Sequence, residues 1–346
     1  MDKVLTSIKR TRPYLDYCIF GGILCLAPWL VANTQWFRFG YLTIVAMFII
    51  YAIVSLGMNI LMGYGGLASL GTAGFMGVGA YLTAILTVDA GLSFFPVFII
   101  TLLFTMLLGL IVGLLSLRVE GFFLAIATLV IAEIFRQIFM QWDIFNGFAG
   151  RSVPEFPRFL SNAAALDRDR TYFLLVGFLV LAMILTYNIF KSPTGRALSA
   201  MRGSESAAAA MGINIFRYRL LAFAVSTGFA GAGGSLFMSF MRFTSPPQWS
   251  LVLSLFVFAV VVIGGVRSVA GTVLGAFIVF AVPDLFLANL PVIGDTHGMA
   301  FVFTGVLVII VVLFSPAGLI YVWYNICYKI KVKAAGLLQK RGGESA

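Results

Sequence analysis

The sequence predicts an all-α fold, a polytopic transmembrane helical bundle of about 8–10 spanning helices with glycine-rich broken or re-entrant segments. Three observations support this prediction: 61% of the 346 residues are hydrophobic, only 10% are charged, and long apolar runs recur along the chain. Soluble proteins carry about 25% charged residues, so this chain lacks the polar surface that a soluble enzyme needs.

Ten segments are apolar over the roughly 20 residues that a bilayer-crossing helix needs. In chain order they are residues 17–33, 41–62, 67–88, 94–117, 121–140, 171–190, 218–240, 250–266, 270–290 and 300–325. Basic residues precede the first segment, as in a signal peptide, but Leu30 breaks the small-x-small cleavage pattern. We therefore expect a retained first helix and one transmembrane domain over residues 17–325.

The net charge of +10 comes from blocks of lysine and arginine between the apolar runs, which is not the single patch of a nucleic-acid-binding protein. The blocks lie in residues 1–16, 191–217 and 326–346. Short loops rich in these residues stay in the cytoplasm, so we expect all three blocks, and both termini, to be cytoplasmic. The longest outer loop is then 141–170, which either docks an external partner or is a solvated connector closed by its own ion pairs.

Cysteine and histidine usage argues against a metal or disulfide framework. Cys18, Cys25 and Cys327 lie in or beside apolar runs, and we interpret them as small packing residues. His297 is the only histidine, so the chain cannot build a multi-histidine metal cluster. No catalytic constellation is visible, and we expect neither an enzyme nor a cofactor on this chain.

A glycine-rich stretch over residues 63–81 interrupts the apolar pattern. Such a stretch permits a broken helix whose amides meet a polar solute, or alternatively a tightly packed small-residue face without ligand contact. The candidate substrate-pathway residues in it are Gly65, Gly66, Ser69, Gly71 and Thr72.

Residues 264–275 repeat the Gly-Gly-x-x-Ser spacing and add Gly264, Gly265 and Ser268 to the candidate pathway. Paired interruptions can mark a duplicated fold with its pathway at the repeat interface. Chance matching in a chain with 36 glycines is the competing explanation. The predicted topology puts both segments near the same side of the membrane.

Two opposite charges, Glu133 and Arg136, lie three residues apart in a predicted span. Each mid-membrane charge costs about 2.5–3.5 kcal/mol, so we expect the two to pair and to face the protein interior. Glu133 is a candidate pathway residue, and a purely structural ion pair is the alternative. Asp284, after Pro283, raises the same question.

The basic loop contains signals for one short cytoplasmic helix. Ala207–Ala210 favour helix, Ser204 can cap it, Glu205 suits the N-terminal dipole and Gly212 can end it. A small alanine-rich face has little to contact within its own chain, so we expect it to dock into a groove on another protein. A plain amphipathic linker is the alternative.

The order and spacing of these motifs resemble the Liv-type branched-chain amino-acid permease family of ABC importers, specifically its longer permease subunit. The resemblance runs from about residue 40 to 320 and is carried by segments 63–81, 118–129, 195–198, 205–214, 248–250, 262–265 and 315–319, together with Glu133.

The resemblance implies a division of labour. The residues that match the family's ATPase-coupling motif are Glu205, Ala207, Ala208, Gly212 and Ile213. The implied partners are two ATP-binding cassette ATPase subunits that carry ATP and Mg, a homologous second permease, and a periplasmic or extracellular solute-binding protein. The implied location is the bacterial cytoplasmic (inner) membrane. The absence of a G-x-x-x-x-G-K-[ST] phosphate loop agrees with an ATPase on other chains.

The sequence departs from the family pattern at several polar positions. Leu67 stands where Gln is common, Thr72 where His or Gln is common, and residues 146–151 replace a Thr-Gly-Gly-Ser type run. The implied substrate is a branched-chain or other small amino acid, with urea or a small aromatic carboxylate as alternatives. A self-sufficient secondary transporter and a membrane-embedded enzyme are the competing classes of function.

Overall fold

The computed structural model describes residues 13–28, 40–116, 122–154, 158 and 166–287, together with 302, 305, 306, 309, 313, 318 and 319. The N-terminal block, the basic tail, His297, Cys327 and most of the predicted span 300–325 therefore lie outside the described residues. The described chain is almost entirely helical, which confirms the predicted all-α fold.

Five helices in the described chain are long and apolar enough to cross a membrane. They are α4 (Gly40–Met58) with its π-helical continuation η1 (Asn59–Tyr64), α6 (Phe94–Ser116), α7 (Phe122–Gln141), α8 (Arg168–Lys191) and α11 (Ile215–Met241). Each agrees with a predicted span to within a few residues.

The other apolar helices of the described chain are shorter than these five. They are α2 (Pro13–Cys25), α5 (Thr72–Val88), α12 (Leu251–Gly264), and α13 (Val269–Ala276), which continues through the π-helix η5 (Phe277–Ala281) into α14 (Val282–Leu287). The 14 residues of α12 extend only about 21 Å, less than the roughly 30 Å hydrocarbon core, so segment 250–266 is not a full span by itself. The helix ends there because Gly265 turns the backbone with φ 112°.

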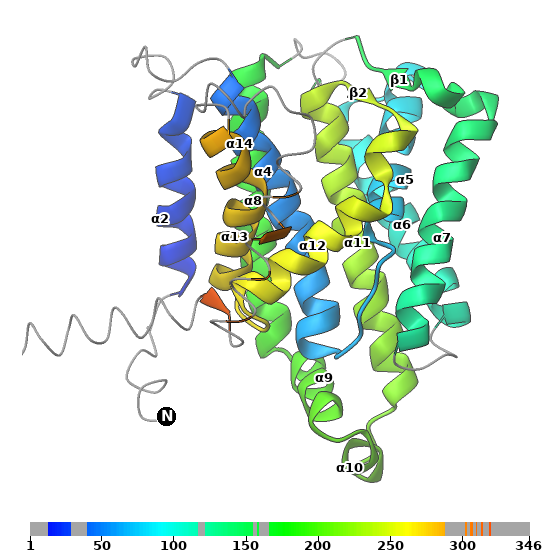
Figure 1. Ribbon diagram of the computed structural model, residues 1–346, viewed down its shortest axis with the longest axis vertical. Helices are drawn as coiled ribbons and strands as arrows, with labels where there is room; N and C mark the ends of the chain where they lie inside the picture. The colour runs from blue at the N-terminus through cyan, green and yellow to red at the C-terminus, as the bar shows by residue number, and fades with distance from the viewer. Residues whose placement is uncertain are drawn as a thin grey trace, which may run out of the picture.

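The helices form one bundle with α4 and α11 at its centre (Figure 1). Most of α4 and α11 is buried, whereas α6, α7 and α8 expose much of their surface, as expected for helices that face lipid or a partner chain. In Figure 1, α2 and α7 lie on opposite flanks, and the short helices α9 (Pro193–Gly203) and α10 (Glu205–Ala210) project from one end.

Small residues let the central helix α11 approach its neighbours closely. A Cβ atom at Gly79 of α5 would lie 2.3 Å from the Gly231 carbonyl oxygen of α11. A Cβ at Gly234 would lie 2.0 Å from the carbonyl oxygen of Met76. These contacts form a seam between α5 and α11 that no larger side chain fits.

The end of the bundle opposite α9 and α10 is closed by a short two-stranded sheet. Strand β1 (Arg151–Ser152) pairs antiparallel with β2 (Phe243–Thr244), with Arg151 opposite Thr244. Arg151 also donates to both carboxylate oxygens of Asp89, at 2.8 and 3.0 Å. Single-turn 3-10 helices η2 (Asp143–Phe145), η3 (Gly147–Ala149) and η4 (Pro246–Trp249) flank the strands. Loop 141–170 is thus tied by Arg151 to the end of α5, a contact the sequence analysis did not predict.

The glycine seam predicts that Gly79→Val destabilises the protein. The added side chain would meet the α11 backbone, and overpacking of this kind costs about 1–3 kcal/mol. We expect a lower thermal midpoint for the detergent-solubilised protein. Gly177→Val is the matched control, because a Cβ at this α8 position meets nothing within 4 Å. Equal midpoints for the two variants would contradict the seam.

Candidate functional site

The two glycine-rich segments meet at one buried side chain, that of Asn59. Its amide nitrogen donates to the Ser268 carbonyl oxygen at 3.2 Å and to Thr272 Oγ1 at 2.6 Å. Its amide oxygen accepts from the Arg267 backbone N–H at 3.0 Å. Asn59 is fully buried at the first position of η1, so a membrane-embedded amide joins segments more than 200 residues apart in the sequence.

The first break lies between η1 and α5, where residues 66–69 and 71 are not helical. Gly66 adopts a left-handed conformation, with φ 69°. Neighbouring helices satisfy the amides around the break: Leu70 N–H donates to Thr128 Oγ1 of α7, and Ala73 N–H donates to Ser254 Oγ of α12, both at 3.0 Å. Irregular backbone at membrane depth persists only where protein or a cavity replaces these bonds.

The second break lies between α12 and α13. Gly264 approaches the start of α13 so closely that a Cβ there would lie 2.1 Å from the Gly271 carbonyl oxygen. Ser268 Oγ caps α13 by accepting from the Gly271 N–H at 3.0 Å. The break therefore folds α13 back against the end of α12.

The Gly-Gly-x-x-Ser repeat has only a partial structural counterpart. The second glycine of each pair has a positive φ, 69° at Gly66 and 112° at Gly265. The serines differ: Ser268 caps α13, whereas Ser69 accepts from the Gly71 N–H at 3.3 Å before α5 begins. Both breaks lie at the end of the bundle that carries α9, because Arg267 donates to Ser199 of α9.

The structure brings most of the predicted pathway residues together at this end. Gly65, Ser69, Gly71, Thr72, Gly264 and Gly265 are buried, Ser268 is partly buried and Gly66 is exposed. The two breaks contact each other through Asn59.

Glu133 is separate from this cluster, and its predicted orientation is wrong. The predicted pair forms, because Arg136 donates through Nε to Glu133 at 2.8 Å and also through a second nitrogen. However, the Glu133 side chain is 44% exposed and that of Arg136 is 24% exposed, on the outer surface of α7 instead of the chain's interior. The reason is that the preceding residue, Ala132, faces the bundle, where Gly74 packs against it. Asp284 is likewise exposed on α14.

Two helices form the projecting element, where the sequence analysis predicted one. Helix α9 begins after Ser192, whose hydroxyl accepts from the Gly195 N–H at 3.2 Å. Ser204 then caps α10 by accepting from the Ala207 N–H, and Gly212 follows it with φ 80°, as predicted. Ala208 is the only buried residue of α10, whereas Met211 just after it is 84% exposed. Glu205 forms an ion pair with Arg219 of α11, which fixes α10 to the bundle.

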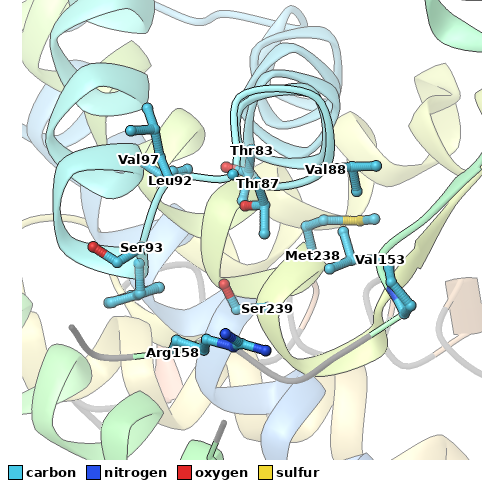
Figure 2. A pocket seen from close by; sticks show the side chains of 13 residues that line it. Thr83, Thr87, Val88, Leu92, Ser93, Val97, Val153, Arg158, Met238 and Ser239 are labelled. Carbon is cyan, nitrogen blue, oxygen red and sulfur yellow. The ribbon is translucent and has the colours of Figure 1, made fainter. Parts of the chain in front are cut away.

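A separate cavity of about 280 Å³ lies beside α5 and α11, at the end of the bundle away from α9. Figure 2 shows hydroxyl groups of Thr83, Thr87 and Ser239 and the guanidinium of Arg158 around it. None of the residues that line it belongs to the predicted pathway.

Sequence reasoning missed Asn59, Arg202 and Arg267. Asn59 is a single polar residue in an apolar run, which was an available signal, since polar residues in membrane helices are rare and usually hydrogen-bonded. The sequence analysis assigned no role to Arg202 or Arg267. In the structure Arg202 donates to the Gly63 carbonyl oxygen, and Arg267 donates to Ser199.

Comparison with known proteins identifies clear relatives. Residues 40–312 match the family described as the branched-chain amino acid transport system permease component. The high-affinity branched-chain amino acid transport system permease protein LivM of Escherichia coli is 33% identical over 92% of this chain and 79% of its own length. A probable LivM permease protein of Methanocaldococcus jannaschii is 24% identical over 80% of this chain and 92% of its own. A probable LivH permease protein of the same organism is 32% identical over 26% of this chain and 28% of its own.

The role of Asn59 predicts that Asn59→Leu destabilises the protein. The substitution keeps the side chain's size but leaves the Arg267 N–H without its acceptor, at a cost of about 1–3 kcal/mol. Thermal unfolding in detergent measures the effect. Ser55→Ala is the control, because Ser55 is also fully buried but bonds only to Tyr51 within its own helix. If both variants unfold at the same temperature, the link between the breaks has no energetic importance.

Proposed function

Because this chain belongs to the branched-chain amino acid transport system permease family, we propose that it is the transmembrane permease subunit of an ATP-driven ABC importer. It is a multi-pass membrane protein. In this proposal it lies in a bacterial cytoplasmic membrane, and a homologous second permease completes the pathway. ATP and Mg bind to two partner ATPase subunits, and an external solute-binding protein delivers the substrate.

The projecting pair α9–α10 is the observation that carries this proposal. Helix α10 lies beyond the bundle with Ala207, Ala209, Ala210 and Met211 exposed, where a groove on another protein can hold it, whereas Ala208 faces its own chain (Figure 1). Arg196 and Arg202 of α9 are flanked by Lys191 at the end of α8 and Arg217 at the start of α11, and this basic block favours a cytoplasmic location.

The exposed ion pair on α7 supports a pathway between two permeases. Glu133 lies about 12 Å along the helix from Gln141, the last residue of α7, and is thus well inside the membrane. Placing such charges against lipid costs about 2.5–3.5 kcal/mol each, so this face of α7 requires cover from protein or water. Gln137 adds a third polar group, because its amide donates to Glu133 at 3.1 Å.

The same groups are chemically suited to an amino-acid substrate. Glu133 can accept hydrogen bonds from the ammonium group of a zwitterion, and Arg136 can donate to its carboxylate from the guanidinium N–H groups that do not hold Glu133. We propose a branched-chain amino acid as the substrate class, since the apolar residues Leu129, Val130 and Ile134 lie beside the pair. The predicted pathway residues at the two breaks then form the cytoplasmic end of the same route.

The first test concerns the ATPase contact. Gly212→Asp places a charge at the exposed end of α10, and we expect co-purification of the ATPase subunits and ATP-dependent uptake to fall about tenfold or more, the effect of losing about 1.4 kcal/mol. Gly147→Asp is the control, since Gly147 is also left-handed, with φ 54°, but lies at the other end of the bundle. Uptake driven by an ion gradient with this chain alone would instead indicate a secondary transporter.

The second test concerns the α7 face. Glu133→Gln removes the charge but retains a hydrogen-bond acceptor, so we expect the complex to assemble while the KM for amino-acid uptake rises about tenfold, as for one lost charged hydrogen bond. Asp143→Asn removes the same charge just beyond α7 and serves as the control. Identical KM values for the two variants would exclude Glu133 from the pathway.

A further inference from the structure

Two arginines connect helix α9 to both glycine-rich breaks. Arg202, in the last turn of α9, donates to the carbonyl oxygen of Gly63 near the end of η1. Arg267, in the turn between α12 and α13, donates in the opposite direction to the hydroxyl of Ser199 in α9. The element that carries α10 is therefore bonded to the backbone before the first break and to the turn that forms the second.

The connection at Arg267 is held in place on several sides. The residue has a left-handed backbone, with φ 74°, which is uncommon outside glycine, and its N–H is fixed by Asn59. Its guanidinium lies 4.8 Å from the centroid of the Tyr64 ring, and that ring stacks on Phe190 at the end of α8, at 4.1 Å. Non-glycine residues with positive φ persist where surrounding contacts fix them, often at functional positions.

The connection at Arg202 acts on a part of the backbone that lies outside a regular α-helix. Gly63 lies in a π-helical turn, and residues 66–69 beyond it have no helical hydrogen-bond ladder. The Leu67 N–H bonds to the Leu61 carbonyl and the Leu70 N–H to a side chain of α7, and single π-turns of this kind are common at functional sites. Gly66 also lies under the Arg202 side chain, since a Cβ there would be 3.5 Å from Arg202 Cγ.

From these contacts we infer that Arg202 and Arg267 are positioning residues for transport: they transmit a displacement of α9–α10 to the two glycine-rich breaks. This inference rests on the proposed function, because it assigns α10 to the ATPase contact. Only Ser204 separates α9 from α10, so movement of one displaces the other. Because Asn59 joins the breaks to each other, the two arginines move them as one unit.

The test uses the complete complex in liposomes, with the second permease, the ATPases and the binding protein, and measures uptake and ATP hydrolysis on the same preparation. For Arg202→Ala and Arg267→Ala we expect ATP hydrolysis to continue while the number of solute molecules taken up per ATP falls about tenfold. A fall of that size corresponds to about 1.4 kcal/mol, similar to one hydrogen bond from a charged donor.

Two further variants separate transmission from general damage. Arg202→Lys keeps a donor for the Gly63 carbonyl, so it should recover much of the uptake per ATP. Arg196→Ala removes the same charge from α9, where Arg196 donates only to the nearby Lys191 carbonyl oxygen, and should keep the wild-type ratio. If the alanine variants keep the wild-type ratio, or if hydrolysis and uptake fall in parallel, the inference is wrong. Absence of ATP-dependent uptake by the wild-type complex would instead overturn the proposed function.

Discussion

The hydrogen bonds of Asn59 are the interaction on which the rest of the structure depends. Lipid offers no partners for backbone groups, so a helix can be interrupted inside a membrane only where the protein supplies those partners itself. Asn59 supplies them at the second break and holds it beside the first. Gly63 must be a glycine for the same reason, because a Cβ there would lie 2.2 Å from the Asn59 amide oxygen.

The parts of the fold that the sequence predicted correctly depend on local chemistry. Apolar length places α6, α8 and α11, and capping chemistry places Ser204 and Gly212 around α10. The sequence also contained the Ser192-Pro193 start of α9, a serine cap followed by proline, but the alanine run drew the prediction to α10 alone. The features that the sequence did not predict depend on contacts between residues far apart in the chain. The partners of Asn59 lie more than 200 residues away. The orientation of Glu133 depends on Ala132 packing against Gly74.

The partly exposed ion pair on α7 indicates that a single chain does not cover all of its charged surface. Inside a single bundle the pair is partly exposed, and the contact between Glu133 and Arg136 reduces the cost of membrane insertion without removing it. The apolar composition that identified this helix as a span predicts a lipid-facing surface, whereas its charges predict a covered one. The two requirements are compatible if part of α7 faces another protein chain across a polar route.

The two ends of the bundle are built from different interactions, and this difference determines which end can move. Beyond the first break, helices α5 and α11 meet backbone to backbone along the glycine seam, and at the end away from α9 Arg151 bonds Asp89 through two oxygens. The seam tolerates little displacement, because closely packed backbones cannot slide past each other without separating. At the α9 end, long arginine side chains reach from one element to another across interrupted backbone. Their hydrogen bonds to Gly63 and Ser199 connect a displacement of α9 to the breaks. In the proposed transmission, a displacement of α10 therefore reaches the two breaks through Arg202 and Arg267.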